Sequence, residues 1–240
     1  MSFIESIITS ILKKGTVVYK SQLSKTVYHI RVQSDSFKNI EYTPGDFLRV
    51  FVGEGKAELS FKEKIRSYSV WHFNKEKCEI DIAATTHGNG PGANWAAQCK
   101  VGDSLHFNWH KSKFIMDNSG DDYVFIGDLS TLSQFYEFNR NLIGKNSYSI
   151  IYSQHTDDFF ADIDNSNPFE FHVLPKNPSD EIFKKLETLK STLRDNTKIY
   201  VAGDSRICIA VTQHLRKNWK WSNHQIKAKP YWNPEKRGLE

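Results

Sequence analysis

The sequence predicts a small antiparallel β-barrel followed by an α/β domain with a parallel sheet. From Gly15 to about Met116, short runs with strand-like alternation are separated by turn residues, which is typical of a barrel or sandwich. Beyond Asn118–Asp122, strand-like runs alternate with helical ones, which is typical of a doubly wound sheet. We therefore expect a boundary in this polar stretch, with domains at 1–118 and 119–240.

The composition is that of a globular protein with mixed surface charge. Of the 240 residues, 39% are hydrophobic and 25% charged, and the net charge is only +4, so no broad nucleic-acid surface is expected. No stretch approaches the length of a membrane span, and we expect a cytoplasmic monomer without membrane insertion. Cys78, Cys99 and Cys208 are far apart, which excludes a disulfide framework and argues against an iron–sulfur cluster.

The first domain is expected to begin with a helix and to continue as strands. Apolar residues recur at helical spacing within Met1–Gly15, and Lys13 and Lys14 suit the end of a helix. Pro44-Gly45-Asp46 is a turn signal. The expected strands are Thr26–Gln33, Phe47–Val52, an extended run Ile65–Phe73, Glu79–Ala84 and Ser104–Trp109, with a helix at about Ala93–Lys100.

The second domain is expected to alternate strands with helices. In such sheets ligands bind beyond the carboxyl ends of the strands. The expected strands are Tyr123–Ile126, Ser147–Tyr152, Phe169–Val173 and Lys198–Val201, and the expected helices are about Leu132–Ile143, Asp180–Leu193 and Arg206–Trp219.

Arg66-Ser67-Tyr68-Ser69 combines a cation, an aromatic ring and hydroxyls on an expected strand. Alternate residues of a strand share a face, so Arg66 and Tyr68 should project together, about 7 Å apart. The Arg fork suits a phosphate oxygen, the Tyr ring suits a flat heterocycle, and Ser69 can bond a ring nitrogen. The alternative is an ordinary Arg and Tyr on a solvated strand.

The glycine-rich stretch from His87 to Trp95 follows an expected strand and opens the inner helix. Glycines allow the backbone to approach a ligand closely, and the N–H groups at a helix start suit an anion such as a pyrophosphate. The alternative is a connecting loop without a ligand. Because Arg66 supplies a second phosphate-binding group in the same domain, we favour the binding interpretation.

Gly127-Asp128 and Gly203-Asp204 each end an apolar strand and precede a helix with Ser or Thr near its start. A glycine at the carboxyl end of a strand lets a nucleotide lie across it, and the acid suits a ribose hydroxyl. Capping of the following helix is an equally good explanation of both Asp residues. The sequence lacks G-x-G-x-x-G, so the usual dinucleotide fingerprint is missing.

Other kinds of catalytic site are poorly supported. His106 and His110 share a face of an expected strand, but no third metal ligand stands near them in the sequence. No G-x-S-x-G motif is present. We therefore predict neither a metal site nor a catalytic side chain.

These blocks together resemble the siderophore-interacting proteins, which are FAD-dependent ferric-siderophore reductases of the ferredoxin–NADP reductase superfamily. The stretch 66–69 resembles the flavin motif R-x-Y-[ST], and 87–97 resembles the family's H-G…G-P…W-A loop. Ile126-Gly127-Asp128 with Thr131 is similar to a G-D-E-T-A-L segment. Val201–Asp204 and Tyr231-Trp232 are similar to V-A-G-E and Y-W segments, and the blocks fall in the family's order.

The resemblance implies an FAD-binding barrel and an NAD(P)H-binding domain, with the flavin rather than a side chain carrying the chemistry. Arg66 would bind the FAD phosphates, Tyr68 would stack on the isoalloxazine, and Ser69 would bond near N5. The implied flavin-binding residues are Arg66, Ser67, Tyr68, Ser69, Thr86, His87, Gly88, Gly90, Pro91, Gly92, Ala93, Asn94, Asp128 and Thr131. The implied NAD(P)H-binding residues are Gly127, Asp128, Ser153, His155, Gly203 and Asp204.

The expected substrate is a ferric siderophore or another ferric chelate, and an anionic one would need a cationic site. Lys62, Lys64, Lys236 and Arg237 are candidates, with solvated surface charges as the alternative. Two other functions stay open: a general flavin or electron-transfer reductase with another acceptor, and a non-enzymatic flavin or siderophore binder. The sequence leaves the choice between NADH and NADPH open, because Ser153–Asp157 offers hydroxyls and a His but no Arg.

Overall fold

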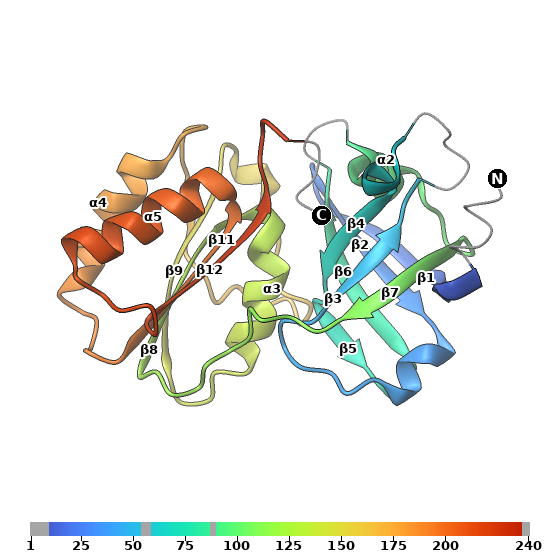
Figure 1. Ribbon diagram of the computed structural model, residues 1–240, viewed down its shortest axis with the longest axis horizontal. Helices are drawn as coiled ribbons and strands as arrows, with labels where there is room; N and C mark the ends of the chain where they lie inside the picture. The colour runs from blue at the N-terminus through green and yellow to red at the C-terminus, as the bar shows by residue number, and fades with distance from the viewer. Residues whose placement is uncertain (1–9, 54–58, 87–89, 237–240) are drawn as a thin grey trace. The chain divides into compact units, whose positions relative to one another are not determined.

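The computed structural model describes residues 10–53, 59–86 and 90–236. The chain divides into two compact units, Met1–Ile115 and Met116–Leu239 (Figure 1). The first is built on an antiparallel sheet and the second on a parallel sheet, as the sequence predicts.

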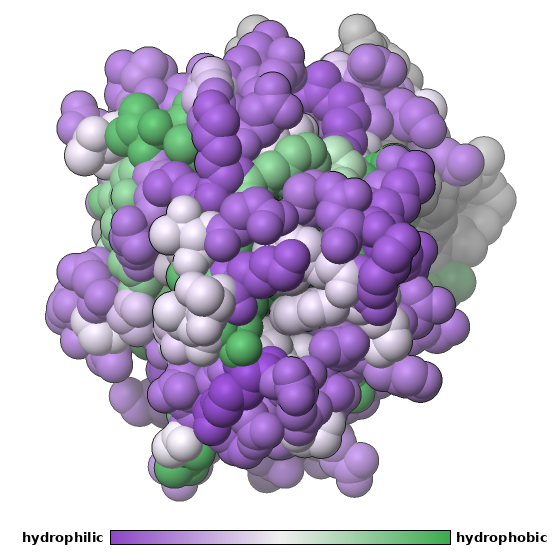
Figure 2. Space-filling view, turned by 90° about the vertical axis from the view of Figure 1, so that its left-hand side faces the viewer, coloured by the Kyte–Doolittle hydropathy of each residue, from purple (hydrophilic) through white to green (hydrophobic). Residues whose placement is uncertain are grey.

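Within the described residues, no helix is both long and apolar enough to span a membrane. The face of the molecule in Figure 2 is mostly hydrophilic, with hydrophobic residues in small separate patches. Ile143, Val173 and Ile209 are exposed large hydrophobic residues of the second unit.

The first unit contains a seven-stranded sheet with the order β4-β3-β7-β1-β2-β6-β5. Neighbouring strands pair antiparallel throughout. Helix α2, Pro91–Gln98, lies between β6 and β7 in the chain. The strands are β1 Lys13–Ser24, β2 Val27–Gln33, β3 Phe47–Phe51, β4 Ile65–Ser69, β5 His72–Asn74, β6 Glu79–Thr85 and β7 Ser104–His110, with 3-10 turns at Asp35–Asn39 and Phe61–Lys64.

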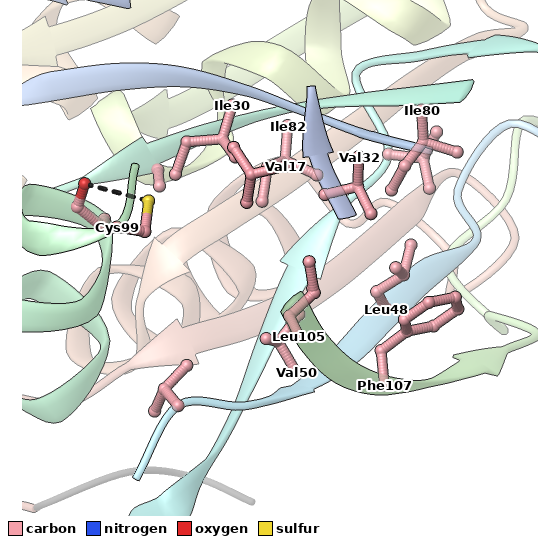
Figure 3. Close-up of a cluster of buried hydrophobic side chains, with 14 of the residues drawn as sticks. Val17, Ile30, Val32, Leu48, Val50, Ile80, Ile82, Cys99, Leu105 and Phe107 are labelled. Atoms are coloured by element: carbon pink, nitrogen blue, oxygen red, sulfur yellow. Dashed lines mark hydrogen bonds between the residues drawn. The ribbon is translucent and has the colours of Figure 1, made fainter. Parts of the chain in front are cut away.

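The core of this unit is formed by side chains from one face of every long strand, and Figure 3 shows them converging. Ile30 and Val32 of β2 meet Ile80 and Ile82 of β6 in register. Helix α2 adds Ala96, and the Cys99 thiol donates to its carbonyl at 3.7 Å (Figure 3). Burial of this shared apolar surface stabilises the sheet, because it removes these side chains from water.

The second unit is a five-stranded parallel sheet with the order β10-β9-β8-β11-β12. Helices α4 and α5 cover one face, where Val124 and Ile126 of β8 are buried. Phe125 points the other way and packs on Phe135 of α3, with ring centroids 5.1 Å apart. The elements are β8 Asp122–Asp128, α3 Leu129–Arg140, β9 Asn146–Ser153, a 3-10 turn at Thr156–Asp158, β10 Phe171–Val173, α4 Ser179–Lys190, β11 Thr197–Asp204, α5 Ser205–Asn218 and β12 Ile226–Trp232.

The predicted helix over Met1–Gly15 is wrong in its C-terminal part, where the chain is already a strand. Ser10 and Ile11 are helical, but β1 begins at Lys13, and residues 1–9 lie outside the described residues. Residues 13–16 instead pair with β7. A Cβ at Gly15 would lie 2.8 Å from Val32, so the glycine allows this strand to pack closely.

The predicted extended run Ile65–Phe73 is two strands, β4 and β5, separated by Val70 and Trp71. Both separating residues are buried. The backbone N–H of Trp71 donates to the Asp81 carbonyl at 2.8 Å. At this point the chain passes from β4, at one edge of the strand order, to β5, at the other. The bend ends the strand that carries Arg66 and Tyr68 directly after Ser69.

A buried carboxylate, Asp81 on β6, joins three strands on the outer side of this sheet. It is 1% exposed and accepts hydrogen bonds from Arg31 at 2.7 Å, while His29 and His72 lie 2.5 and 3.2 Å away. Burial acts to raise the pKa of Asp81, but the bonds to His29, His72 and Arg31 outweigh it and hold this pKa well below its usual range. The ionised carboxylate therefore stabilises the unit.

Replacing Asp81 with Ala should lower the free energy of unfolding by about 3 kcal/mol at pH 7, because Arg31 loses its counter-charge and His29 and His72 lose a hydrogen-bond partner. Since the folded pKa is lowered, this contribution is present above the unfolded pKa of about 3.9 and is lost as the pH falls below it. Urea unfolding of both proteins at several pH values measures this. Glu76→Ala, at an exposed position, should change little. A pH-independent difference would contradict the role of the charge.

Candidate functional site

Arg66 and Tyr68 share one face of β4, as the alternation of the strand predicts. They pair in register with Val50 and Leu48 of β3, whose side chains belong to the core. Ser67 pairs with Arg49 and is exposed, so it lies on the opposite face. The guanidinium of Arg66 donates to the carbonyls of Lys62 and Ile65 at 3.0 and 2.5 Å, which fixes its stem beside the strand.

The start of α2 closes directly on this pair. A Cβ at Gly92 would lie 3.0 Å from the Cγ of Arg66 and 3.0 Å from the hydroxyl of Tyr68. That hydroxyl donates to the Gly92 carbonyl at 3.2 Å. The ring of Trp95, one helical turn on, lies 5.3 Å from the Tyr68 ring. A cation, a phenol and the beginning of a helix are thus brought together in one place.

The beginning of α2 suits an anion. Gly90 is the N-cap and supplies no side-chain cap, and Pro91 has no N–H group. The N–H groups of Gly92 and Ala93 therefore have no acceptor within the helix. The aliphatic stem of Arg66 lies alongside, and these N–H donors together with the Arg66 side chain fit the phosphates of a dinucleotide cofactor such as FAD.

The other residues predicted for the flavin are placed as follows. Ser69 ends β4 and pairs with Phe47. Thr86 anchors the end of β6, because its N–H and hydroxyl both donate to the Thr26 carbonyl, at 2.7 and 3.0 Å. His87 and Gly88 lie outside the described residues. Their role in binding stays a prediction.

In the second unit, two carboxylates lie at the carboxyl ends of neighbouring strands and cap helices. Asp128 accepts from the Ser130 N–H at 2.8 Å at the start of α3, and Asp204 accepts from the Arg206 N–H at 2.9 Å at the start of α5. The capping explanation of both residues is confirmed. Asp128 also accepts from the Asp204 N–H at 3.0 Å and from the Trp232 indole at 2.9 Å, so it ties three strand ends together.

Gly127 and Gly203 are required by close packing at these strand ends. A Cβ at Gly127 would lie 2.3 Å from the Thr131 hydroxyl oxygen, and one at Gly203 would lie 2.3 Å from the Asp128 carboxylate. Gly203 also has a φ of +106°, which side chains rarely adopt. The two glycines therefore have structural roles within the polar cluster, and their contact with a nucleotide stays a prediction.

Tyr152, at the end of β9, is paired in register with Asp128. Its hydroxyl is buried and has no hydrogen-bond partner among the described residues. Burial, followed by the charges of Asp128 and Asp204, raises the pKa of the Tyr152 phenol well above its usual value. The group therefore stays protonated and is a donor left without an acceptor, which sequence reasoning did not single out.

Ser153 and His155 follow Tyr152 at the same strand end. The Ser153 hydroxyl donates to Asp158 at 2.7 Å, and His155 is exposed. Of the four basic residues considered for the substrate, Lys62 and Lys236 are exposed and Lys64 is buried, whereas Arg237 lies outside the described residues. Binding roles for these positions stay predictions.

Among the described residues, no group of three or more His, Cys, Asp or Glu side chains could hold a metal ion. Burial raises the pKa of the Cys208 thiol to about 12 and also raises that of Cys99. Neither thiol is ionised near neutral pH, so neither is a nucleophile.

Two family models match the chain. Residues 54–109 match the siderophore-interacting FAD-binding domain, and residues 120–235 match the siderophore-interacting protein domain. The ferric vibriobactin reductase ViuB of Vibrio cholerae is 24% identical over 174 residues, which are 70% of this chain and 64% of that protein. The chain thus matches less than two thirds of the length of this curated relative.

Several solved structures share the fold. The siderophore-interacting protein SipS of Aeromonas hydrophila has a TM-score of 0.75 at 18% identity, with 94% of each chain covered. The siderophore-interacting protein of Acinetobacter baumannii has a TM-score of 0.78 at 15% identity, with 92% of this chain and 90% of that one covered. The ferredoxin–NADP+ reductase of Plasmodium falciparum has 0.72 at 17%, with 92% and 96% covered.

The fold is therefore that of the ferredoxin–NADP reductases, with an antiparallel sheet domain followed by a parallel one. Within this class the chain belongs to the siderophore-interacting protein family.

The contact of Gly92 with β4 gives a sharp test of the flavin site. Gly92→Ala should weaken FAD binding about tenfold, because the added methyl group must displace Arg66 or Tyr68. The helix itself should become no less stable, since Ala favours helices over Gly. Equilibrium titration with FAD measures the affinity.

Gln98→Ala is the control, because Gln98 is exposed in the last turn of the same helix and is not among the residues implied to bind the flavin. It should bind FAD as the wild type does. An equal loss in both variants would contradict the assignment of the site to the Arg66–Tyr68 pair.

Tyr152→Phe should leave the protein at least as stable as the wild type, because a buried hydroxyl without a partner costs about 1–3 kcal/mol. Tyr136→Phe should instead lose about 1 kcal/mol, since the Tyr136 hydroxyl donates to the Phe160 carbonyl at 2.5 Å. Urea unfolding compares the two. Equal losses would show that the Tyr152 hydroxyl has a partner in solution.

Proposed function

We propose that this protein is a ferric-siderophore reductase that uses FAD and NAD(P)H. The observation that carries the proposal is the approach of Gly92 to Arg66 and Tyr68, in a chain matched by both domain models of the family. The curated relative is named a ferric vibriobactin reductase, which supports a ferric siderophore as the substrate.

In the first unit, the Arg66 guanidinium and the N–H groups at the start of α2 would bind the FAD phosphates. The Tyr68 phenol, backed by Trp95 at 5.3 Å, would present its face to the isoalloxazine, and Ser69 would offer its hydroxyl. Because Tyr68 is held by its bond to Gly92, the ring is positioned before the cofactor arrives.

In the second unit, the edge formed by Gly127, Asp128, Gly203 and Asp204 would bind NAD(P)H. This edge is the carboxyl end of β8 and β11, where parallel sheets bind nucleotides. Asp128 is already held by four donors, from Ser130, Asp204 and Trp232, so its role would be to fix the shape of the edge.

FAD supplies the redox conversion when bound, because nicotinamide delivers two electrons at once and Fe(III) accepts one. One NAD(P)H therefore reduces two ferric ions and yields NAD(P)⁺, two ferrous ions and a proton. Hard oxygen ligands hold iron less tightly once its charge falls, so reduction favours its release. No side-chain acid or base is needed for this electron transfer.

The proposal is tested by anaerobic spectroscopy of the purified protein carrying FAD. NADH or NADPH should bleach the flavin, and a ferric siderophore should restore its absorbance while a ferrous chelator traps Fe(II). Restoration by a redox protein or free flavin but not by ferric siderophores would favour a general reductase. A flavin that neither donor bleaches would favour a non-enzymatic binder.

Arg66→Ala should lower FAD affinity tenfold or more, because charge-assisted bonds to phosphate contribute about 1.5–3 kcal/mol. Arg49→Ala is the matched control, since Arg49 is exposed on the opposite face of the adjacent strand. FAD retained after gel filtration measures the difference. Equal retention by the two variants would rule out Arg66 as the phosphate ligand.

A further inference from the structure

We infer that the donor site prefers NADH to NADPH, and that Asp157 and Asp158 beyond the end of β9 cause this preference. The inference rests on the proposed function, because it concerns the donor of that reaction. NADPH differs from NADH by a phosphate on the 2′-oxygen of the adenosine ribose. Discrimination therefore depends on the charge of the residues at the place where that oxygen would lie.

The topology indicates which residues these are. β8, α3 and β9 form the first strand–helix–strand unit of a nucleotide-binding sheet, and β9 lies parallel to β8. In such units an acid after the second strand bonds the ribose 2′-hydroxyl, whereas an Arg there accommodates a 2′-phosphate. Asp128, the last residue of β8, pairs in register with Tyr152 near the end of β9. Ser153 and the turn Thr156–Asp158 therefore follow at the carboxyl ends of these strands.

The charges at this edge favour a hydroxyl over a phosphate. Asp157 is exposed. Asp158 is 5% exposed and accepts a hydrogen bond from the Ser153 hydroxyl at 2.7 Å. From Asn146 to Pro175 the sequence contains no Lys or Arg. A 2′-phosphate here would be repelled by two carboxylates. The Ser153 hydroxyl could not donate a hydrogen bond to it, because that hydroxyl already donates to Asp158.

A cation on the neighbouring strand end does not alter this balance. Arg206, at the start of α5, acts on the Tyr152 phenol through its charge. Its guanidinium donates to both carboxylate oxygens of Asp204, at 2.6 and 3.2 Å. The pair is close to neutral, so Arg206 is already bound by a carboxylate of this chain.

Two measurements test the inference. Anaerobic flavin reduction should show a kcat/KM for NADH at least tenfold above that for NADPH. Calorimetric titration should show that AMP binds at least tenfold more tightly than 2′,5′-ADP, which differs from AMP only by the 2′-phosphate. The second measurement needs no redox step, so it decides the preference even if neither donor reduces the flavin, which would contradict the proposed function alone. Equal or reversed preference in the titration would overturn the inference.

Variants test the residues. Asp157→Arg should narrow the difference in affinity between AMP and 2′,5′-ADP at least fivefold, mainly by tighter binding of 2′,5′-ADP. Asp195→Arg makes the same charge change at an exposed position before β11, at the opposite edge of the sheet, and should leave the difference unchanged. No change with Asp157→Arg, or the same change with both, would overturn the assignment to the end of β9.

Discussion

Gly92 approaches β4 so closely that a methyl group on it would lie 3.0 Å from both Arg66 and Tyr68. This contact depends on a glycine in the first turn of α2 and on two side chains that share a strand face. The register of β3 with β4 fixes that face, because it sets Arg66 and Tyr68 level with Val50 and Leu48 of the core. The hydrophobic core thus determines where the cation and the phenol lie.

At the carboxyl ends of β8, β11 and β12, the second unit is held together by hydrogen bonds to a carboxylate. Asp128 links the end of β12 with the starts of α3 and α5, through bonds from Trp232, Ser130 and Asp204. Such a network needs glycine at positions 127 and 203, where side chains would collide with its members. A carboxylate that is fully hydrogen-bonded within the protein holds the edge rigid, which suits a site whose task is to position a ligand.

Much of the fold could be predicted from the sequence, because the change from strand-like alternation to strand–helix alternation reflects two kinds of sheet. The shared face of Arg66 and Tyr68 followed from the two-residue period of a strand. Their contact with Gly92 could not be predicted, since it depends on how α2 packs on a strand far away in the sequence.

The errors also have physical causes. The sequence does not predict β1, because only Gly15 and Val17 of this strand are fully buried and the rest shows no regular alternation. The sequence does not predict β12 either. This strand carries Lys227, Lys229 and Pro230, which an edge strand tolerates better than a central one. The unpartnered hydroxyl of Tyr152 has no sequence signal at all, because it reflects the absence of an acceptor in the folded chain.

The most direct test of the central claim is a titration of FAD fluorescence with the protein stripped of its cofactor. Tyr68 should quench the isoalloxazine by close contact, so the emission should fall and level off at one FAD per chain. Emission that is unchanged by an excess of the folded protein would show that no flavin binds beside Tyr68, and would contradict the account.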